Sequence, residues 1–327
     1  MRVMVTGGAG YVGSVTVERL VAAGHDVTVL DNLRTGHADS VVPAASLVVG
    51  SFGDRAFVAG VLAERRVEVV LHCAARSLVA ESVAQPALYY QENVVGGLAL
   101  LDAMRDAKVD RIVLSSTAAV YGEPRRIPVE EDDPKDPVNP YGATKLAFEG
   151  MMRSYATYGL RSIALRYFNV AGASERNGER HDPETHLIPN LLKAVISGTS
   201  ATLFGTDYPT ADGTPIRDYI HVMDLADAHL AALERTEAAA AGLEAMNLGS
   251  GSGFSVRQVL AATEDVVGTA VPVTYGPRRS GDPPALVASR RLAEERLGWT
   301  PARGTLEEMI GSAWRFASQH RPPEPSS

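Results

Sequence analysis

The chain has 327 residues, about twice the usual length of a single domain, which predicts one large α/β unit or two lobes that share a core. Its 39 acidic and 31 basic side chains give a net charge of −8, so it lacks the Lys/Arg excess that favours binding to nucleic acid or to an anionic membrane. A hydrophobic share of 45% and a charged share of 21% exclude full-length disorder, and a single cysteine, Cys73, excludes an intrachain disulfide framework.

The start of the chain carries no targeting signal that we can identify. Met1 is followed at once by a strand-like run, Arg2 to Thr6, which leaves no room for a basic start and an apolar signal core. No apolar run reaches the roughly 18 residues that a membrane span needs. We therefore expect a soluble cytoplasmic protein with neither a membrane nor a nucleic-acid partner, and we predict no metal site.

The first half of the chain alternates short apolar runs with longer segments of helical period, which predicts parallel strands joined by crossover helices. The runs are rich in Val, Ile and Leu without a polar alternation, as in strands that are covered on both faces. The predicted strands are 2–6, 26–31, 46–52, 67–74, 111–116 and 162–170, and the predicted helices are 11–23, 54–64, 88–107 and 141–158. The fold class is therefore α/β with a doubly wound parallel sheet.

The composition changes after Val170 to a polar stretch over 171–185, which predicts a loop leading into a smaller, mixed α/β lobe. We place a first domain at 1–170, to which some of 215–245 returns, and a second lobe at 171–320. Capping boxes at Ser255 with Gln258 and at Thr305 with Glu308 predict two helix starts in that lobe. The proline-rich end, 321–327, predicts a flexible tail.

A glycine-rich loop follows the first strand and carries Gly7, Gly10 and Gly13 at steps of three. Glycines at this place let the backbone turn sharply and approach a pyrophosphate, which then lies on the free N–H groups of the helix start. Asp31 ends the second strand, eighteen residues after Gly13, where it can accept hydrogen bonds from an adenosine ribose. A 2′-phosphate would meet this carboxylate, which favours NAD over NADP, although Arg34 lies close in sequence and weakens the argument.

Tyr141 and Lys145 are four residues apart at the start of a predicted helix, so they share one helix face. A tyrosine that acts as a base near pH 7 needs its pKa lowered by about three units, roughly 4 kcal/mol. The lysine and an oxidised nicotinamide ring are positive charges of the kind that could supply this shift. Upstream, Ser115, Ser116 and Thr117 end the fifth strand at the carboxyl edge of the sheet, where ligands of such folds bind.

These motifs resemble the extended short-chain dehydrogenase/reductase superfamily, and within it the UDP-glucose 4-epimerase family. The glycine loop and the Tyr/Lys pair identify only the superfamily, whereas runs in the second lobe are more specific. The resemblance extends almost from end to end and is carried by the runs 1–8, 115–122, 165–169, 207–210, 217–226 and 247–249. It implies a Rossmann sheet, a substrate-binding lobe, NAD as cofactor and a UDP-sugar as substrate.

The resemblance implies hydride transfer from C4 of the sugar to NAD, rotation of the 4-keto sugar and return of the hydride to its opposite face. Tyr141 would be the base and later the acid, Lys145 would lower its pKa and hold the nicotinamide ribose, and Thr117 would hydrogen-bond the reacting hydroxyl. Thr stands where many relatives have Ser, and because both carry a hydroxyl, the role is kept.

The resemblance also implies two sets of binding residues. Arg217 and Arg279 match diphosphate-binding positions, and Tyr219 and Asp282 match contacts to the substrate nucleotide. The implied cofactor contacts are Gly7, Gly10, Tyr11, Val12, Gly13, Asp31, Asn32, Ser51, Phe52, Cys73, Ala74, Ala75, Asn93, Ser115, Tyr141, Lys145 and Tyr167. The implied substrate contacts are Thr117, Tyr141, Phe168, Asn169, His186, Leu187, Phe204, Arg217, Tyr219, Arg279 and Asp282.

The sequence departs from the family pattern at several of these places. Ser51 stands where relatives carry Asp, so we expect a weaker contact to adenine, and Phe52 either stacks on the base or fills core. Ser77 occupies a position that is Lys in some members, so one cofactor contact is missing or is supplied by Arg76. Leu286 falls where residue size is thought to decide whether N-acetylated sugars fit.

Three rival functions remain to be weighed. A nucleotide-sugar 4,6-dehydratase needs an acid pair after Thr117, where this chain has Ala118 and Ala119. A UDP-GlcNAc or UDP-glucuronate 4-epimerase would use the same chemistry. A non-catalytic NAD-sensing regulator would need neither the Tyr/Lys pair nor a sugar pocket. Family members are commonly homodimers, for which the helices predicted over 88–107 and 141–158 are the candidate interface.

Overall fold

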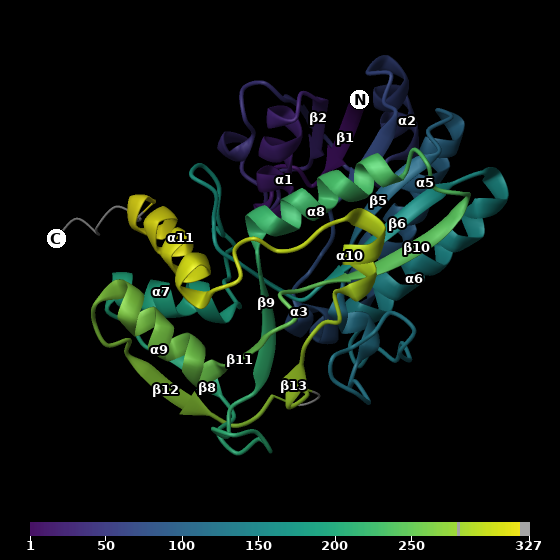
Figure 1. Ribbon diagram of the computed structural model, residues 1–327. Helices are drawn as coiled ribbons and strands as arrows, with labels where there is room; N and C mark the ends of the chain where they lie inside the picture. Colours follow the sequence, from purple (N-terminus) through teal and green to yellow (C-terminus); the bar gives the residue numbers. More distant parts are fainter. Residues whose placement is uncertain (280–281, 321–327) are drawn as a thin grey trace.

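The computed structural model describes residues 1–279 and 282–320, so the predicted tail over 321–327 lies outside the described residues. A seven-stranded sheet, parallel throughout, dominates the fold (Figure 1). Its order is β3-β2-β1-β4-β5-β6-β10, and the strands are β1 (Arg2–Thr6), β2 (Asp26–Asp31), β3 (Ser46–Val49), β4 (Val69–His72), β5 (Arg111–Thr117), β6 (Arg161–Tyr167) and β10 (Gly242–Leu248). The predicted α/β class with a doubly wound parallel sheet is confirmed.

Helices cover both faces of this sheet, which explains why its strands are apolar throughout. Val3 and Val5 of β1 face a core shared with α1 (Tyr11–Ala22) and α8 (Val222–Arg235). Met4, between them, faces the opposite core. That second core is built with α2 (Arg55–Glu64), α5 (Gly96–Asp106) and α6 (Pro140–Tyr155).

The segment predicted as one helix over 88–107 is divided into three parts. A short helix, α4 (Pro86–Tyr89), is followed by a π-helical segment, η2 (Tyr90–Val95), and then by α5. The wider π turn contains Asn93, which is buried and hydrogen-bonded to the backbone of Arg76 and to Thr144 on α6. A pattern of period 3.6 does not reveal such a turn.

The strand predicted over 162–170 is in fact two strands in different sheets. β6 ends at Tyr167, and β7 (Asn169–Ala171) pairs with β9 (Ile216–His221) in a second sheet. Phe168 is the single residue between them, and its N–H donates to the Leu248 carbonyl at the end of β10. The main sheet therefore leads directly into the smaller lobe.

The smaller lobe combines short strands with three helices, at the lower left of Figure 1. Its four-stranded sheet adds β11 (Gly253–Ser255) and β13 (Ala285–Leu286) to β7 and β9, and β8 (Ala201–Phe204) pairs with β12 (Val273–Gly276). The helices α7 (Leu187–Ser197), α9 (Val256–Val267) and α11 (Leu306–Gln319) pack on a core of their own. The predicted capping boxes at the starts of α9 and α11 are both present.

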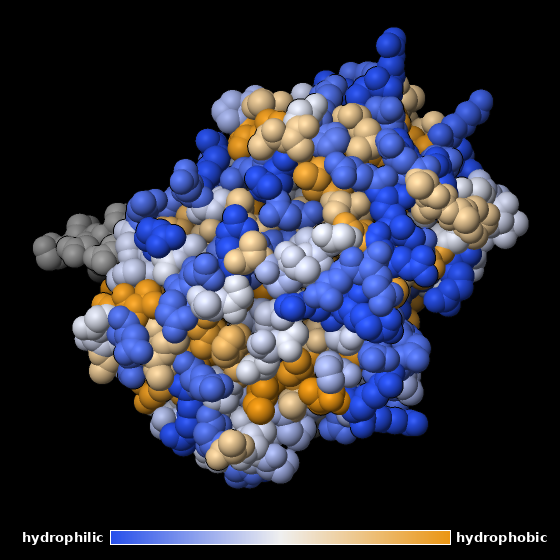
Figure 2. All heavy atoms as spheres, viewed as in Figure 1, coloured by the Kyte–Doolittle hydropathy of each residue, from blue (hydrophilic) through white to orange (hydrophobic). Residues whose placement is uncertain are grey.

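Shorter helical segments complete the described chain. They are η1 (Ala38–Ser40), α3 (Val79–Ala84), η3 (Ala118–Tyr121), η4 (Ala156–Tyr158) and α10 (Arg291–Leu297). In the view of Figure 2, hydrophobic residues reach the surface as separate patches among hydrophilic ones. Within residues 1–279 and 282–320, no helix has the length and apolar character to cross a bilayer.

Candidate active site

A cavity of about 1050 Å³ opens at the carboxyl edge of the main sheet and continues into the smaller lobe. Its volume is at the upper end of the usual range for small-molecule sites. It contains most of the residues singled out from the sequence: Gly7, Gly10, Tyr11, Val12, Gly13, Asp31, Asn32, Phe52, Cys73, Ala74, Ala75, Thr117, Tyr141, Lys145, Tyr167, Phe168, Asn169, His186, Leu187, Phe204, Arg217, Tyr219, Arg279 and Asp282.

Three of the implied cofactor contacts are not among the residues that line the cavity. Ser51 is exposed, and its hydroxyl accepts from the Gly53 N–H at 3.2 Å. Asn93 is buried between the Arg76 backbone and α6, as described above. Ser115 is buried one layer behind the wall, with its Oγ 3.1 Å from the Cys73 Sγ.

The glycine loop has the geometry that a dinucleotide site requires. Gly7 adopts φ = +72°, and a Cβ there would lie 2.6 Å from the Ala74 nitrogen. A Cβ on Gly13 would clash with the Gly7 carbonyl oxygen. Helix α1 begins after Gly10 without a side-chain cap, so its first N–H groups are available to an anion at the cavity. The residues present therefore fit a bound pyrophosphate.

Asp31 lines one end of the cavity, at the end of β2. Its carboxylate accepts from the Ala9 N–H at 3.0 Å and from the Leu33 N–H at 2.8 Å, which fixes its orientation. Arg34 also lines the cavity, but its guanidinium pairs with Glu92 at 2.7 Å. The cation that could have favoured a 2′-phosphate is therefore already engaged.

Arg76, considered above as a replacement for the missing lysine at position 77, does not line the cavity. Its Nη1 contacts both carboxylate oxygens of Glu81, at 3.0 and 3.1 Å. The side chain at the cavity wall is Ser77. The arginine thus stabilises the loop before α3 in ion pairs of its own.

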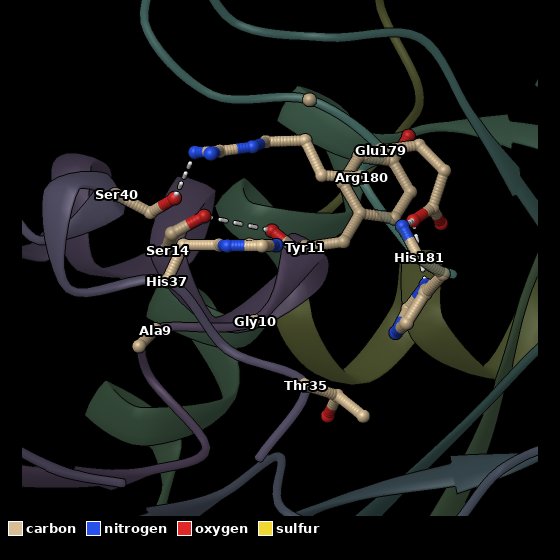
Figure 3. Close-up of a pocket in the computed structure, with 11 residues that line it drawn as sticks. Ala9, Gly10, Tyr11, Ser14, Thr35, His37, Ser40, Glu179, Arg180 and His181 are labelled. Carbon is tan, nitrogen blue, oxygen red and sulfur yellow. Dashed lines mark hydrogen bonds and ion pairs between the residues drawn. The ribbon is translucent and has the colours of Figure 1, made fainter. Parts of the chain in front are cut away.

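A smaller polar cavity of about 10 Å³, the size of one water molecule, lies beside the glycine loop (Figure 3). There the Tyr11 hydroxyl donates to the Gly172 carbonyl at 2.6 Å, which ties α1 to the loop after β7. Glu179 approaches Tyr11 from that loop and pairs with the His181 Nδ1 at 2.5 Å. Sequence reasoning missed Glu179 and His181, although the charge density of 171–185 was a signal.

Two carboxylate–imidazole pairs sit on this loop, because Glu184 also contacts the His186 Nδ1 at 2.8 Å. The hydrogen bond and charge of Glu179 raise the pKa of His181 against the effect of burial. Burial would lower the pKa of His186, but its bond to Glu184 and the charges of both glutamates raise it. Glu179, Glu184 and His186 bring ligand atoms within 4.8 Å of one another, and each glutamate contacts an imidazole of the same loop.

Tyr141 and Lys145 enter the cavity from the first turns of α6. The helix starts sharply because the Asn139 side chain caps the Gly142 N–H at 2.9 Å and Pro140 occupies the first position. Burial raises the pKa of Tyr141 to about 12, opposed by a hydrogen bond with Thr117. Burial lowers the pKa of Lys145 to about 8, opposed by the charges of Cys73 and Glu149.

Beneath these residues lies a buried charge network that the sequence reading did not identify. Arg166 on β6 makes two bonds to Glu149 on α6, at 2.6 and 3.0 Å, and both side chains are almost fully buried. Ser116 donates to the same carboxylate at 2.7 Å, and Arg166 donates to the Tyr121 hydroxyl at 2.8 Å. The network fastens α6 to the end of β5 below Tyr141.

The other end of the cavity gathers cations and aromatic rings from the smaller lobe. Arg217 on β9 pairs with Asp282 at 2.5 Å, and the Arg279 guanidinium lies 4.2 Å from the centre of the Phe204 ring. Asn169, at the start of β7, donates to the Asp218 carbonyl at 3.1 Å. Two arginines beside a ring are suited to a nucleotide diphosphate.

Comparison with known proteins agrees with this geometry. Residues 3–249 match the profile of the NAD dependent epimerase/dehydratase family. A UDP-glucose 4-epimerase of Corynebacterium glutamicum is 49% identical over 320 residues, covering 97% of this chain and 96% of its own.

Two solved structures with bound ligands are also similar. The UDP-glucose 4-epimerase of Brucella ovis in complex with NAD has a TM-score of 0.93 at 44% identity and covers 96% of this chain and 98% of its own. That of Bifidobacterium longum in complex with NAD+ and UDP has a TM-score of 0.92 at 35% identity, covering 98% and 99%. With its glycine loop, Tyr/Lys pair and full-length similarity to these proteins, the chain belongs to the NAD dependent epimerase/dehydratase family.

Proposed function

We propose that this protein interconverts UDP-glucose and UDP-galactose, by NAD-dependent epimerisation at C4 of the sugar. The observation that carries the proposal is that one cavity contains the glycine loop, the Tyr141/Lys145/Thr117 group and Arg217 with Arg279. The cavity therefore offers a dinucleotide site, an acid/base group and a diphosphate site together. The relatives that bind NAD and UDP support the same ligand pair.

The acid/base work falls to Tyr141. When bound, NAD would supply reversible hydride acceptance at C4 of the sugar and the positive charge of its oxidised ring. Tyr141 accepts the proton of the 4-hydroxyl and later donates it back, while Thr117 hydrogen-bonds that hydroxyl. Since burial raises the pKa of Tyr141 to about 12, the phenol needs a lowering of about five units to act near neutral pH. The Lys145 ammonium and the ring charge are the cations that supply it.

Arg217 and Arg279 hold the substrate diphosphate in this proposal. Arg217 pairs with Asp282 at 2.5 Å, which orients its guanidinium, and in this proposal the second oxygen of the same carboxylate and Tyr219 contact the nucleoside. Fixing the nucleotide at this end leaves the sugar free to turn over, as C4 epimerisation requires. Asp31 at the opposite end favours NAD over NADP.

A substrate panel tests the proposal and separates it from its rivals. Purified protein is assayed with UDP-glucose, UDP-galactose, UDP-GlcNAc, UDP-GalNAc and UDP-glucuronate. Interconversion of the first two supports the proposal, whereas turnover of the other sugars alone would favour a different 4-epimerase, for which Leu286 at the cavity wall is the residue to examine. NAD binding without any turnover would favour the regulator. A 4,6-dehydratase is disfavoured because Ala118 and Ala119 line the cavity where an acid is needed.

We also propose a homodimer, formed through the surface of η2, α5 and α6, in a cytoplasmic enzyme. Val95 and Leu98, three residues apart, are 50% and 43% exposed there. Exposed apolar side chains that lie together mark protein–protein contact sites. Sedimentation should give twice the chain mass for the native protein and a monomer for Leu98→Glu. Tyr275→Glu, at a similarly exposed position on β12, is the control. A native monomer would contradict the proposal.

A further inference from the structure

The end of β5 carries three consecutive hydroxyls that are held from different sides. Thr117 reaches the cavity, where it bonds with Tyr141. Ser116 donates to Glu149 on α6 at 2.7 Å. Ser115, with its side chain on the opposite face of the sheet, lies 2.8 Å from the Nε2 of His229 on α8. The strand end that presents Thr117 is thus fastened from both helical layers.

The hydrogen-bond partners of His229 determine its tautomer. Its Nδ1 lies 2.8 Å from the Leu225 carbonyl oxygen, and because a carbonyl can only accept, Nδ1 carries the hydrogen. Nε2 is then the acceptor, so the Ser115 hydroxyl donates to it. His229 is fully buried, and burial lowers its pKa to about 4, so the imidazole stays neutral through the pH range in which the enzyme would work.

The same serine is a hydrogen-bond partner of the buried lysine. The Lys145 Nζ donates to the Ser115 carbonyl at 2.8 Å. Both the side chain and the carbonyl of Ser115 are therefore engaged, the first with α8 and the second with α6. The Ser115 hydroxyl also lies 3.1 Å from the Cys73 Sγ and is a hydrogen-bonding neighbour of Tyr167, two residues of the cavity wall.

We propose that His229 is a positioning residue for the reaction, because its Nε2 fixes Ser115 and thereby the carbonyl that orients the Lys145 ammonium beside Tyr141. This inference rests on the acid/base roles proposed for Tyr141 and Lys145. Without that acceptor, the buried Ser115 hydroxyl keeps only the Cys73 Sγ and Tyr167 as neighbours, and we expect the strand end to shift as the side chain repacks toward them. A shift of about 1 Å in such groups can cost a hundredfold in rate.

Two amide substitutions separate the two nitrogens of the imidazole. In His229→Asn the amide reaches the Nδ1 position, so the bond to Leu225 is kept and Ser115 loses its acceptor. In His229→Gln the amide reaches the Nε2 position and can accept from Ser115. We expect kcat for UDP-galactose to fall about tenfold or more in the Asn variant and no more than about threefold in the Gln variant, with KM little changed in both.

The pH profile of kcat distinguishes positioning from a general loss of structure. The titratable groups around Lys145 and Tyr141 are Glu149 on the same helix, Cys73 and His72 at the end of β4, and Tyr167 at the end of β6. If the ammonium loses its fixed acceptor, less positive charge reaches Tyr141 and the phenol needs a higher pH to ionise. The acidic limb should therefore move to higher pH by about half a unit or more in His229→Asn, but not in His229→Gln.

Ser115→Ala breaks the same bond from the strand side and decides the matter if His229→Asn does not fold. It should show the same fall in kcat and the same shift of the acidic limb to higher pH. The double variant Ser115→Ala/His229→Asn should have a kcat no lower than that of the single variants. Unchanged kcat, or a fall in kcat with an unshifted limb, would overturn the inference. Each variant is first checked for native circular dichroism and bound NAD. If the wild-type protein has no epimerase activity, the proposed function fails instead.

Discussion

At the scale of single residues, we expect Glu92 to decide which charges meet a dinucleotide beside Asp31. It holds the Arg34 guanidinium at 2.7 Å, while Asp31 presents its carboxylate from the end of β2. Glu92→Gln frees Arg34 to meet a 2′-phosphate, so we expect the preference for NAD over NADP to fall by a few-fold, about the value of one partly exposed ion pair. Competition of NADP against NAD in cofactor-free protein measures the ratio.

Glu307→Gln, an exposed substitution of the same kind on α11, serves as the control and should leave the ratio unchanged. If Glu92→Gln behaves in the same way, Arg34 has no part in cofactor choice and Asp31 acts alone.

In the proposed mechanism, Tyr141 is the residue on which turnover depends most directly. Tyr141→Phe removes the hydroxyl that accepts and returns the proton, so kcat should fall by about a hundredfold or more, as is typical when a general acid/base is lost. NAD should still bind, because the glycine loop and Asp31 are untouched. Absorbance of released cofactor and a coupled assay for UDP-glucose provide the two measurements. A rate close to wild type would refute the assignment of the base.

Residues at the cavity could be predicted from the sequence where a motif fixes both their spacing and the strand or helix that carries them, as for Gly7 and Lys145. The side chains that hold them could not. Arg166 pairs with Glu149, and His229 bonds with Ser115. The two members of each pair lie on different elements, so no local spacing in the sequence reveals the contact. Which partner a buried polar group finds is decided by the tertiary structure.

At the scale of elements, the join between β1 and α1 depends on close backbone approach. Gly13→Ala would force a Cβ against the Gly7 carbonyl oxygen, so we expect lost NAD binding and a lower melting temperature. Gly60→Ala on α2 is the matched control, because a Cβ there meets nothing within 4 Å. It should stabilise the helix by about 0.5–1 kcal/mol. Thermal unfolding with and without NAD compares the two variants, and equal behaviour would contradict the role given to Gly13.

The helices and strands themselves were predicted well where apolar periodicity is strong, as over 26–31. The errors have physical causes. A π turn at η2 keeps an apolar pattern close to that of an α-helix, and an apolar run over 162–170 gives no sign that Phe168 separates two sheets. Both features depend on distant partners, Thr144 for the first and β9 for the second.

At the scale of the whole molecule, three buried histidines make the fold sensitive to acid. Burial lowers the pKa of His72 to about 3 and those of His221 and His229 to about 4. Unfolded histidines titrate near 6.5, so below that pH the unfolded chain binds protons that the native state does not. Their stabilisation is therefore complete above about pH 6.5 and is lost progressively as the pH falls toward 4.

We expect the free energy of unfolding to decrease by roughly 2 kcal/mol for each of these histidines between pH 7 and pH 5. Urea titrations at the two pH values give this difference. His320→Gln, at an exposed position after α11, should leave the difference in unfolding free energy between the two pH values unchanged. A stability that is constant down to pH 5 would show that the buried imidazoles accept protons in the native state.

The single residue between β6 and β7 has a mechanical consequence for the whole enzyme. Because only Phe168 separates the sheet that carries the glycine loop from the sheet that bears Arg217, no flexible tether separates the two halves at this point. This short link limits how far the two sheets can move apart, so in the proposed reaction the sugar would turn over between walls whose separation is restricted.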